Sequence, residues 1–234
     1  MIGLVAEGHE VRRLVLWRHG RTEWNKVGRA QGHADVPLDD LGQVQAQRAA
    51  VLLATYRPAF VWSSDLLRAR QTAAELITLT GLDLVLDRRL REYDVGARQG
   101  MTRDEFRAAF PDLFARYLAG EDEVQIPDAE VTADVRTRML AVLEEATKAV
   151  GLGETGVLVG HGAALRTGVL AFFGVEVGGD DSTPAGRRRE MLAGMANCAW
   201  TVLEQHPSYG WQIVDYNAQN LPEPVSLDDS PLAH

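Results

Sequence analysis

Cysteine and lysine are almost missing from this chain of 234 residues. Its one cysteine, Cys198, excludes an intramolecular disulfide framework and any zinc site built from several cysteines. Lys26 and Lys148 are the only lysines among 24 basic residues, so nearly every positive charge belongs to an arginine. Arginine grips phosphate and carboxylate groups through a planar fork of N–H donors. The bias is therefore either a genome-wide preference or a sign of anion binding.

Long apolar runs and an excess of positive charge are absent as well. Arginine or glycine interrupts each apolar run before it reaches the roughly 20 residues that a membrane-spanning helix needs. The first residues lack the basic region and the apolar stretch of a signal peptide, so we expect a cytoplasmic protein. With 33 acidic against 24 basic residues, the net charge of −9 argues against binding to nucleic acid or to a membrane.

Short patterns of buried strands alternate with helical patterns along the chain. Apolar runs predict strands at 14–17, 59–62, 82–86, 156–160, 198–203 and 211–216. Helices are predicted at 40–56, 65–79, 102–110, 111–118, 131–150 and from 161 to 173. Ser64 or Asp65 is expected to cap the second helix, and Gly81 to end it. This alternation predicts an α/β layered fold with a largely parallel sheet, in which ligand sites lie at the C-terminal ends of the strands.

Charged and small residues follow four of the predicted strands at the point where each strand ends. In chain order they are Arg18-His19-Gly20, Ser63-Ser64 with Arg68, Glu92, and His161-Gly162. Because such strand ends meet at one edge of a sheet, we expect two histidines, two arginines and one carboxylate to converge there.

This set of side chains can transfer a phosphoryl group through a histidine. A neutral imidazole is a nucleophile, and Arg18 and Arg68 would disfavour the protonated form of His19. Two arginines and a protonated His161 would balance the charge of about −1.5 to −2 on a phosphate monoester. Glu92 would protonate the leaving alkoxide and later accept a proton from the attacking water. The chemistry needs no metal ion, so we expect neither a metal nor another cofactor.

Other residues around these segments are expected to help bind the substrate. Asn25 can donate its side-chain amide to a phosphate oxygen. Gly20 and Gly162 leave room for a close approach of the backbone.

The four segments, with Thr22 and Asn25 after the first of them, resemble the signature segments of the histidine phosphatase superfamily, and its phosphoglycerate mutase-like branch most. The resemblance covers roughly residues 12–217, in the family's order. It implies a Rossmann-like, three-layer α/β/α core with a largely parallel sheet and a small helical insert. The insert would lie at about 91–131 within a single domain, 1–234, whose tail at 220–234 is flexible.

The same resemblance implies roles for individual residues. His19 would be the phosphorylated nucleophile, while Arg18, Arg68 and His161 would hold the phosphoryl group. Glu92 would be the general acid and base, and Asn25 a phosphate contact. Gln31 and Gly32 lie where the family's first loop approaches the substrate.

Two departures from the family's pattern fall around the expected mouth of the site. Members with hydrolase activity often carry Gly-x-Trp-Glu-Gly after the acid, where this chain has Gly-Ala-Arg-Gln-Gly at 96–100. The family's common Gly-Glu-Ser reads Ala129-Glu130-Val131 here. Both changes concern the choice of substrate rather than the chemistry.

Several residues keep more than one interpretation. The carboxylates that could replace Glu92 as the acid are Glu23, Asp94, Glu105 and Glu130. Arg187–Arg189 is a solvated run of charge or else a rim for an acidic substrate. Cys198 is expected to be a small buried side chain, and Trp200, Trp211 and Tyr216 to pack on the sheet. The histidines without companions that suggest a role are His9, His33, His206 and His234.

The favoured function is a phosphatase that hydrolyses a small phosphorylated metabolite, a sugar or glycerate phosphate, through a phosphohistidine. A cofactor-dependent mutase is the alternative, but the basic residues Arg103, Arg107 and Arg116 of the insert are separated rather than adjacent. A catalytically silent domain that binds phosphorylated ligands is a second alternative, which the presence of both His19 and Glu92 disfavours. The segments 197–200 and 211–218 also resemble the actinobacterial glucosyl-3-phosphoglycerate phosphatases, one group of the family. Because dimers are the commonest oligomers, a homodimer is expected.

Overall fold

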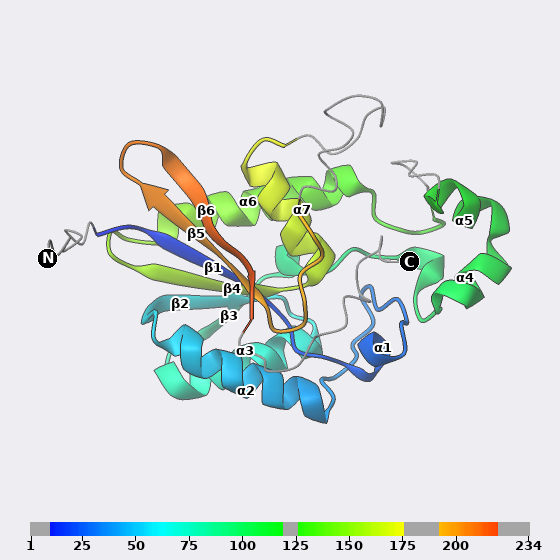
Figure 1. The fold of residues 1–234 in the computed structure, drawn as a ribbon, viewed down its shortest axis with the longest axis horizontal. Helices are drawn as coiled ribbons and strands as arrows, with labels where there is room; N and C mark the ends of the chain where they lie inside the picture. The colour runs from blue at the N-terminus through cyan, green and yellow to red at the C-terminus, as the bar shows by residue number, and fades with distance from the viewer. Residues whose placement is uncertain (1–9, 119–125, 176–191, 220–234) are drawn as a thin grey trace, which may run out of the picture.

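The computed structural model describes residues 10–118, 126–175 and 192–219 (Figure 1). Within these residues six strands form one sheet in the order β3-β2-β4-β1-β5-β6. The strands are β1 (Arg13–Arg18), β2 (Pro58–Ser63), β3 (Leu84–Leu86), β4 (Thr155–Gly160), β5 (Trp200–His206) and β6 (Gly210–Ala218). β1, β2, β3 and β4 run parallel, whereas β5 and β6 are antiparallel to their neighbours. The predicted, largely parallel sheet is confirmed.

Helices cover both faces of the sheet. The helices of the described residues are α1 (Glu23–Lys26), α2 (Asp40–Ala54), α3 (Leu67–Thr80), α4 (Arg103–Ala109), α5 (Pro111–Leu118), α6 (Thr132–Ala149) and α7 (Gly162–Phe172). Two short 3-10 turns, η1 (Arg88–Leu90) and η2 (Gly96–Arg98), lie between β3 and α4. α2 and α3 pack on one face, and α6 and α7 on the other (Figure 1). The fold is the three-layer α/β/α arrangement expected from the sequence.

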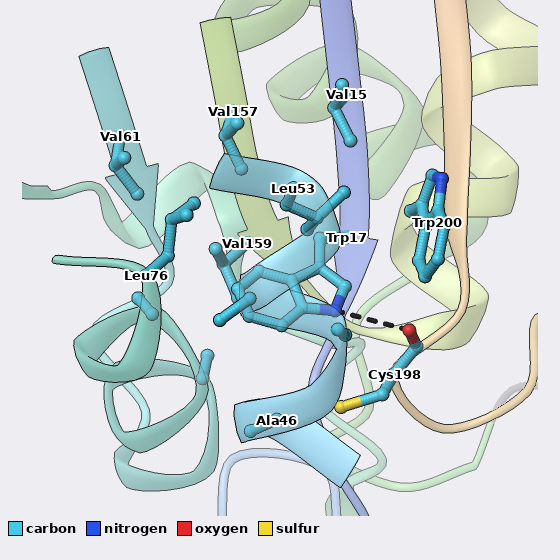
Figure 2. Close-up of a cluster of buried hydrophobic side chains, with 14 of the residues drawn as sticks. Val15, Trp17, Ala46, Leu53, Val61, Leu76, Val157, Val159, Cys198 and Trp200 are labelled. Atoms are coloured by element: carbon cyan, nitrogen blue, oxygen red, sulfur yellow. Dashed lines mark hydrogen bonds between the residues drawn. The ribbon is translucent and has the colours of Figure 1, made fainter. Parts of the chain in front are cut away.

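Alternate residues of β1 show how the two apolar layers are built. Leu14 and Leu16 pack with α6 and α7, whereas Val15 and Trp17 pack with α2 and α3 (Figure 2). All four side chains are fully buried, as in a strand covered on both faces. The indole nitrogen of Trp17 donates to the carbonyl of Cys198 over 3.2 Å, so this large side chain keeps no orphan donor. Each such burial contributes about 1.5–3 kcal/mol to the free energy of unfolding.

The predicted start of α3 is wrong by two residues. The helix begins at Leu67, and its N-cap residue makes no side-chain hydrogen bond. Asp65 instead accepts two hydrogen bonds of 2.6 Å from the guanidinium of Arg91. The amide of Leu67 donates to the carboxylate of Asp35, which comes from a distant loop. A cap supplied from elsewhere in the chain leaves no local sequence signal.

The region expected as an insert, at about 91–131, carries η2, α4 and α5 away from the sheet (Figure 1). Thr102 and Glu105 form the predicted capping box, in which each side chain accepts from the other residue's amide. The arginine run 187–189 and the tail 220–234 lie outside the described residues. No helix in the described parts is both long and apolar enough to cross a bilayer.

Candidate active site

The C-terminal ends of three parallel strands bring the predicted residues together. Beyond the ladders, the amide of His19 donates to the carbonyl of Gly160 over 3.0 Å, and the amide of Ser64 to that of Val159 over 2.9 Å. These bonds tie the ends of β1 and β2 to that of β4. As a result the imidazoles of His19 and His161 lie with their ring centres 5.1 Å apart.

His19 presents a neutral imidazole. Its Nδ1 lies 2.7 Å from the carbonyl oxygen of Gly20, and because a carbonyl only accepts, Nδ1 carries the proton and Nε2 keeps a lone pair. Burial and the positive charges of Arg68 and Arg18 hold the pKa of His19 well below its ordinary value of 6.5. The hydrogen bond to Gly20 raises the pKa of His19, but burial and the two charges lower it by more. His19 therefore has the protonation state that nucleophilic attack requires.

His161 is also neutral, but as the other tautomer. Arg68 donates from Nε to its Nδ1 over 3.2 Å, so Nε2 carries the proton and donates to the hydroxyl of Ser64 over 2.9 Å. Burial, then the charges of Arg68 and Arg18, hold the pKa of His161 well below 6.5. The positive charge expected on His161 does not form in the protein alone, because desolvation and the arginines oppose it. A bound phosphate dianion would favour that charge.

Arg18 and Arg68 are buried cations. Arg68 is 1% exposed, and its two terminal nitrogens donate to the carbonyls of Ala34 and Gly32 over 2.7 and 2.8 Å. Arg18 is 5% exposed and donates to the carbonyl of Met195. Such charges tolerate burial only where they are hydrogen-bonded or paired. Two guanidinium groups beside two neutral imidazoles produce a positive potential that suits the oxygens of a phosphoryl group.

Glu92 lies at the start of α7, close to the cluster. Its carboxylate accepts from the amides of Ala163 and Ala164 over 3.1 and 2.9 Å, and from the amide of Tyr93 over 2.9 Å. The N-cap of α7 is His161, whose side chain makes no cap bond, so Glu92 supplies the cap from another segment. The acid predicted from the sequence thus meets the turn that begins directly after His161.

The other carboxylates considered as the acid have different partners. These are Lys26 for Glu23, Arg29 for Glu105, His33 for Asp94 and Arg138 for Glu130. Among the carboxylates considered, Glu92 is the one that caps the helix following His161.

Asn25 and Gln31 are both fixed by Thr22. The amide oxygen of Asn25 accepts from the Thr22 amide over 3.1 Å and from Asn197 Nδ2 over 3.3 Å. The Thr22 hydroxyl lies 3.0 Å from the amide oxygens of both Asn25 and Gln31. These contacts orient Asn25 with its nitrogen as the donor side.

Three glycines allow close packing around the cluster. A Cβ atom on Gly162 would lie 3.1 Å from Nε of Arg18, so the guanidinium packs tightly against the first turn of α7. A Cβ on Gly20 would lie 2.4 Å from the carbonyl oxygen of Gly42, and one on Gly42 would lie 1.9 Å from that of Arg21. The backbone after His19 therefore packs directly on the first turn of α2.

Sequence reasoning missed several residues that support the site. Thr72 accepts from the amide of Gly20 over 3.0 Å and donates to the carbonyl of Arg68 over 2.7 Å. Asn197 Nδ2 lies 3.3 Å from the carbonyl of His19. Thr72 is a single polar residue within α3 and belongs to no motif. Asn197 lies in a segment that the resemblance marks, but the resemblance gives this residue no role.

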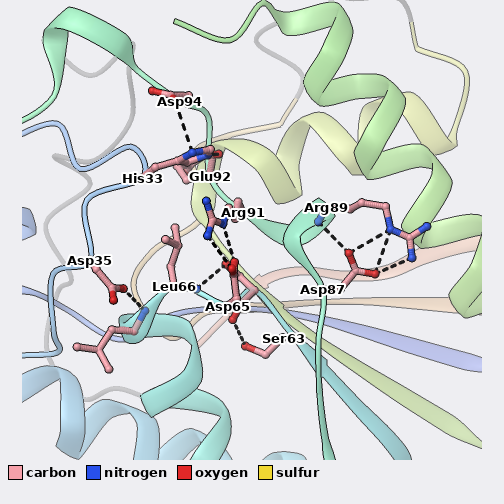
Figure 3. A network of polar contacts seen from close by, with 12 residues as sticks. His33, Asp35, Ser63, Asp65, Leu66, Asp87, Arg89, Arg91, Glu92 and Asp94 are labelled. Atoms are coloured by element: carbon pink, nitrogen blue, oxygen red, sulfur yellow. Dashed lines mark hydrogen bonds and ion pairs between the residues drawn. The ribbon is translucent and has the colours of Figure 1, made fainter.

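The sequence gives His33 no companion that suggests a role, whereas the structure gives it two partners. Its Nε2 donates to the carbonyl of Glu92 over 2.9 Å, and its Nδ1 lies 3.5 Å from the carboxylate of Asp94 (Figure 3). The prediction that Cys198 is buried and that Trp200 packs on the sheet is confirmed. Trp211 and Tyr216 pack, partly buried, on the layer formed by α6 and α7.

Comparison with known proteins gives the same family as the motifs in the sequence. Residues 14–219 match the model of the histidine phosphatase superfamily (branch 1). Glucosyl-3-phosphoglycerate phosphatase from Mycolicibacterium vanbaalenii is 39% identical over 203 residues, 84% of this chain and 85% of its own. A solved mycobacterial glucosyl-3-phosphoglycerate phosphatase in complex with VO3 has a TM-score of 0.75 at 33% identity, covering 89% of this chain and 100% of that one. A probable phosphoglycerate mutase from an Enterobacter species is 34% identical over 160 residues, 68% of this chain and 74% of its own.

The family model spans all four motif-bearing segments, and the solved relative shares the fold. The resemblance stated from the motifs is confirmed, and so is the prediction of a phosphatase. The chain belongs to the histidine phosphatase superfamily.

Proposed function

We propose that the protein hydrolyses a small phosphomonoester of the sugar or glycerate type through a phosphohistidine on His19. The observation that carries the proposal is the state of that imidazole, which is buried, neutral and tied by Nδ1 to Gly20 beside Arg18 and Arg68. Nε2 attacks phosphorus, an N–P bond forms, and the bond from phosphorus to the leaving oxygen breaks. Glu92 in its acid form gives a proton to that oxygen.

The second half of the reaction returns the enzyme to its starting state. Glu92, now a carboxylate, takes a proton from a water molecule whose oxygen attacks phosphorus, and the N–P bond breaks to release phosphate. Arg18 and Arg68 stabilise the phosphoryl oxygens in both steps. His161 gains its second proton as the dianion binds and then donates to the same group.

For the substrate we propose glucosyl-3-phosphoglycerate or a phosphate ester similar to it. Support comes from the relatives of that name, 39% and 35% identical to this chain. The late segments contribute Asn197 beside the backbone of His19, in one of the two regions that resemble this group of phosphatases.

The test is a panel of phosphorylated metabolites and 4-nitrophenyl phosphate, with kcat/KM measured for each from the release of phosphate. We expect the highest value for glucosyl-3-phosphoglycerate. A higher value for another sugar or glycerate phosphate would replace the substrate but keep the reaction. No turnover of any compound, with retained phosphate binding, would favour the silent binding domain.

A mutase is the second candidate, because one relative carries the name of a probable phosphoglycerate mutase. Incubation with 3-phosphoglycerate, with and without a bisphosphoglycerate primer, separates the two. We expect phosphate release that needs no primer. Primer-dependent formation of 2-phosphoglycerate with little free phosphate would establish the mutase instead.

Two further parts of the proposal concern assembly and location, a homodimer in the cytoplasm. Sedimentation equilibrium is expected to give twice the chain mass of 25.7 kDa. A mass equal to one chain would refute the dimer.

A further inference from the structure

A pair of opposite charges next to Glu92 has no part in the chemistry described so far. Glu130 lies just before α6, and Arg138 lies within that helix. Arg138 donates from Nε and Nη2 to the two oxygens of Glu130 over 2.7 and 2.8 Å. Their side chains are 17% and 18% exposed. The bidentate contact holds the guanidinium plane in one orientation.

The same guanidinium also binds the backbone that leads to the acid. Nη1 donates to the carbonyls of Arg89 and Arg91 over 2.7 and 2.6 Å, and Nη2 donates to the carbonyl of Glu92 over 3.0 Å. Three carbonyls within four residues therefore converge on Arg138. Only the planar fork of an arginine offers enough donors in fixed directions for this.

Glu130 holds the backbone on the other side of the acid. Its amide donates to the carbonyl of Asp94 over 2.9 Å, and its carboxylate accepts from the Asp94 amide over 3.3 Å. Val95 and Ala129 add an isolated antiparallel bridge beside this contact. The segment that carries Glu92 is thus held on both sides by one charge pair, although it has no strand or helix of its own.

We propose that Arg138, oriented by Glu130, is a positioning residue that sets the place of the Glu92 carboxylate for proton transfer. The inference rests on the proposed function, since it takes Glu92 as the general acid. A general acid has to come within about 2.6–3.2 Å of the oxygen that it protonates, directly or through one water. Three hydrogen bonds to carbonyls at 89, 91 and 92 fix the backbone from which that carboxylate extends.

A positioning role and a merely structural role predict different dependence on the leaving group. A 4-nitrophenolate departs readily without a proton, whereas an alkoxide departs only with one. Loss of the acid's position therefore lowers kcat/KM in proportion to the basicity of the leaving group. Loss of folded protein lowers kcat/KM for all substrates by one factor, so the ratio between two substrates, measured on one preparation, is unaffected.

The experiment compares 4-nitrophenyl phosphate, phenyl phosphate and the best alkyl phosphate of the panel in five proteins. These are the wild type, Glu92→Gln, Arg138→Met, Arg138→Lys and Arg136→Met. Arg136→Met is the matched control, because Arg136 lies on the same helix and donates to the carbonyl of Val175, in another part of the chain. Arg138→Lys retains the positive charge beside Glu130 but lacks the planar fork of donors. It therefore tests the same role if Arg138→Met folds poorly.

We expect Glu92→Gln to lower kcat/KM for the alkyl phosphate by about 10²–10⁴-fold and for 4-nitrophenyl phosphate far less. Arg138→Met is expected to change the same ratio by about 10–100-fold, Arg138→Lys by less, and Arg136→Met to leave it at the wild-type value. An unchanged ratio in both Arg138 variants, whatever their overall activity, would overturn the inference. An unchanged ratio in Glu92→Gln would instead overturn the role of Glu92 and thus the proposed mechanism.

Discussion

Two regions meet at the carboxylate of Glu92, and they are held in place in different ways. The buried cluster consists of Arg18, His19, Arg68 and His161, each at most 5% exposed. The first two and His161 lie at the ends of the hydrogen-bonded strands β1 and β4, and Arg68 lies in the first turn of α3. The acid segment, residues 91–94, follows the 3-10 turn η1 and is partly exposed. Its backbone is held by side chains from distant elements. His33 is one of them (Figure 3), and Arg138 is another.

Because the two regions are held differently, a substitution has a different effect in each of them. In the cluster a changed side chain removes a group that touches the phosphoryl group in the proposed mechanism, while the sheet keeps the backbone in place. In the acid segment a changed side chain moves the backbone, and the reacting group moves with it. We therefore expect large, substrate-independent losses from the cluster. The side chains that hold the acid segment, as distinct from Glu92 itself, should give smaller, substrate-dependent losses.

The largest effect is expected for His19→Ala in the cluster. Removing the nucleophile should lower kcat/KM by roughly 10⁵-fold and abolish the covalent intermediate, because no other group in the proposed mechanism accepts the phosphoryl group. Rapid quenching in alkali should trap a base-stable, acid-labile phosphoprotein in the wild type. His206→Ala serves as the control, since that histidine stacks on Tyr209 at the far end of β5. Turnover of His19→Ala within tenfold of the wild type would contradict the mechanism.

Arg68→Met should have the next largest effect. It removes the donor to His161 and a cation beside His19 while keeping most of the side-chain volume. We expect kcat/KM to fall on the order of 10²–10³-fold for every substrate, as when one donor to a developing charge is removed. The ratio between alkyl and aryl phosphates should stay near that of the wild type. A loss confined to alkyl phosphates would show that the two regions are not distinct.

The pH dependence of the wild type gives a third test. Burial and two arginines lower the pKa of His19, so its imidazole stays unprotonated as the pH falls through 6.5. The acid limb of kcat/KM that reports this group should therefore lie well below pH 6.5, and Arg68→Met should move it upward. A limb centred at 6.5 in the wild type would contradict the burial of a neutral nucleophile.

Stability should depend on pH for the same reason. The unfolded chain takes up protons on His19 and His161 once the pH falls below 6.5, whereas the folded protein does not. The free energy of unfolding should therefore be fully present above pH 6.5 and decline below it, by up to about 1.4 kcal/mol per pH unit for each histidine. Urea unfolding of the wild type and of His19→Ala at several pH values gives the slope of the free energy of unfolding against pH. The difference between the two slopes is the contribution of His19.

The smallest effect is expected for Arg91→Met at the edge of the acid segment. Arg91 and Asp65 form a bidentate pair, but their side chains are 21% and 23% exposed, so we expect a loss of only about 0.2–1 kcal/mol. The pKa of Asp65 is lowered mainly by its hydrogen bonds from Arg91. The contribution is thus present above pH 3.8 and lost as the pH falls through the lowered value. Urea unfolding near pH 7 should resolve the difference, and a loss of free energy of unfolding well above about 1 kcal/mol would reject the prediction.

The sequence predicted the features that have local signals better than the contacts between distant residues. Strands covered on both faces leave continuous apolar runs, as at Leu14 to Trp17, and helix ends leave local signals such as the capping box at Thr102 and the glycine at 81. Because the site follows those strands directly, the positions of His19, Arg68 and His161 follow from the same patterns.

What could not be predicted depends on contacts between distant residues. The carboxylate that receives the first amide of α3 comes from Asp35, and the cap of α7 comes from Glu92. The neutral state of His161 depends on burial, which a motif does not report. Arg138 appears in the sequence as one more polar residue of a long amphipathic helix, since its three backbone acceptors lie more than 40 positions earlier in the chain.

The contact between the backbones at Gly20 and Gly42 has a consequence for tolerance to mutation. Neither position bears a functional group, and Gly42 lies on a helix that meets no phosphate oxygen in the mechanism. Yet a single methyl group at Gly42 would fall 1.9 Å from a carbonyl oxygen of the turn that follows the nucleophile. A saturation screen for activity should therefore score Gly42 as severely as the arginines, and a survey that ranks residues only by their chemistry would overlook it.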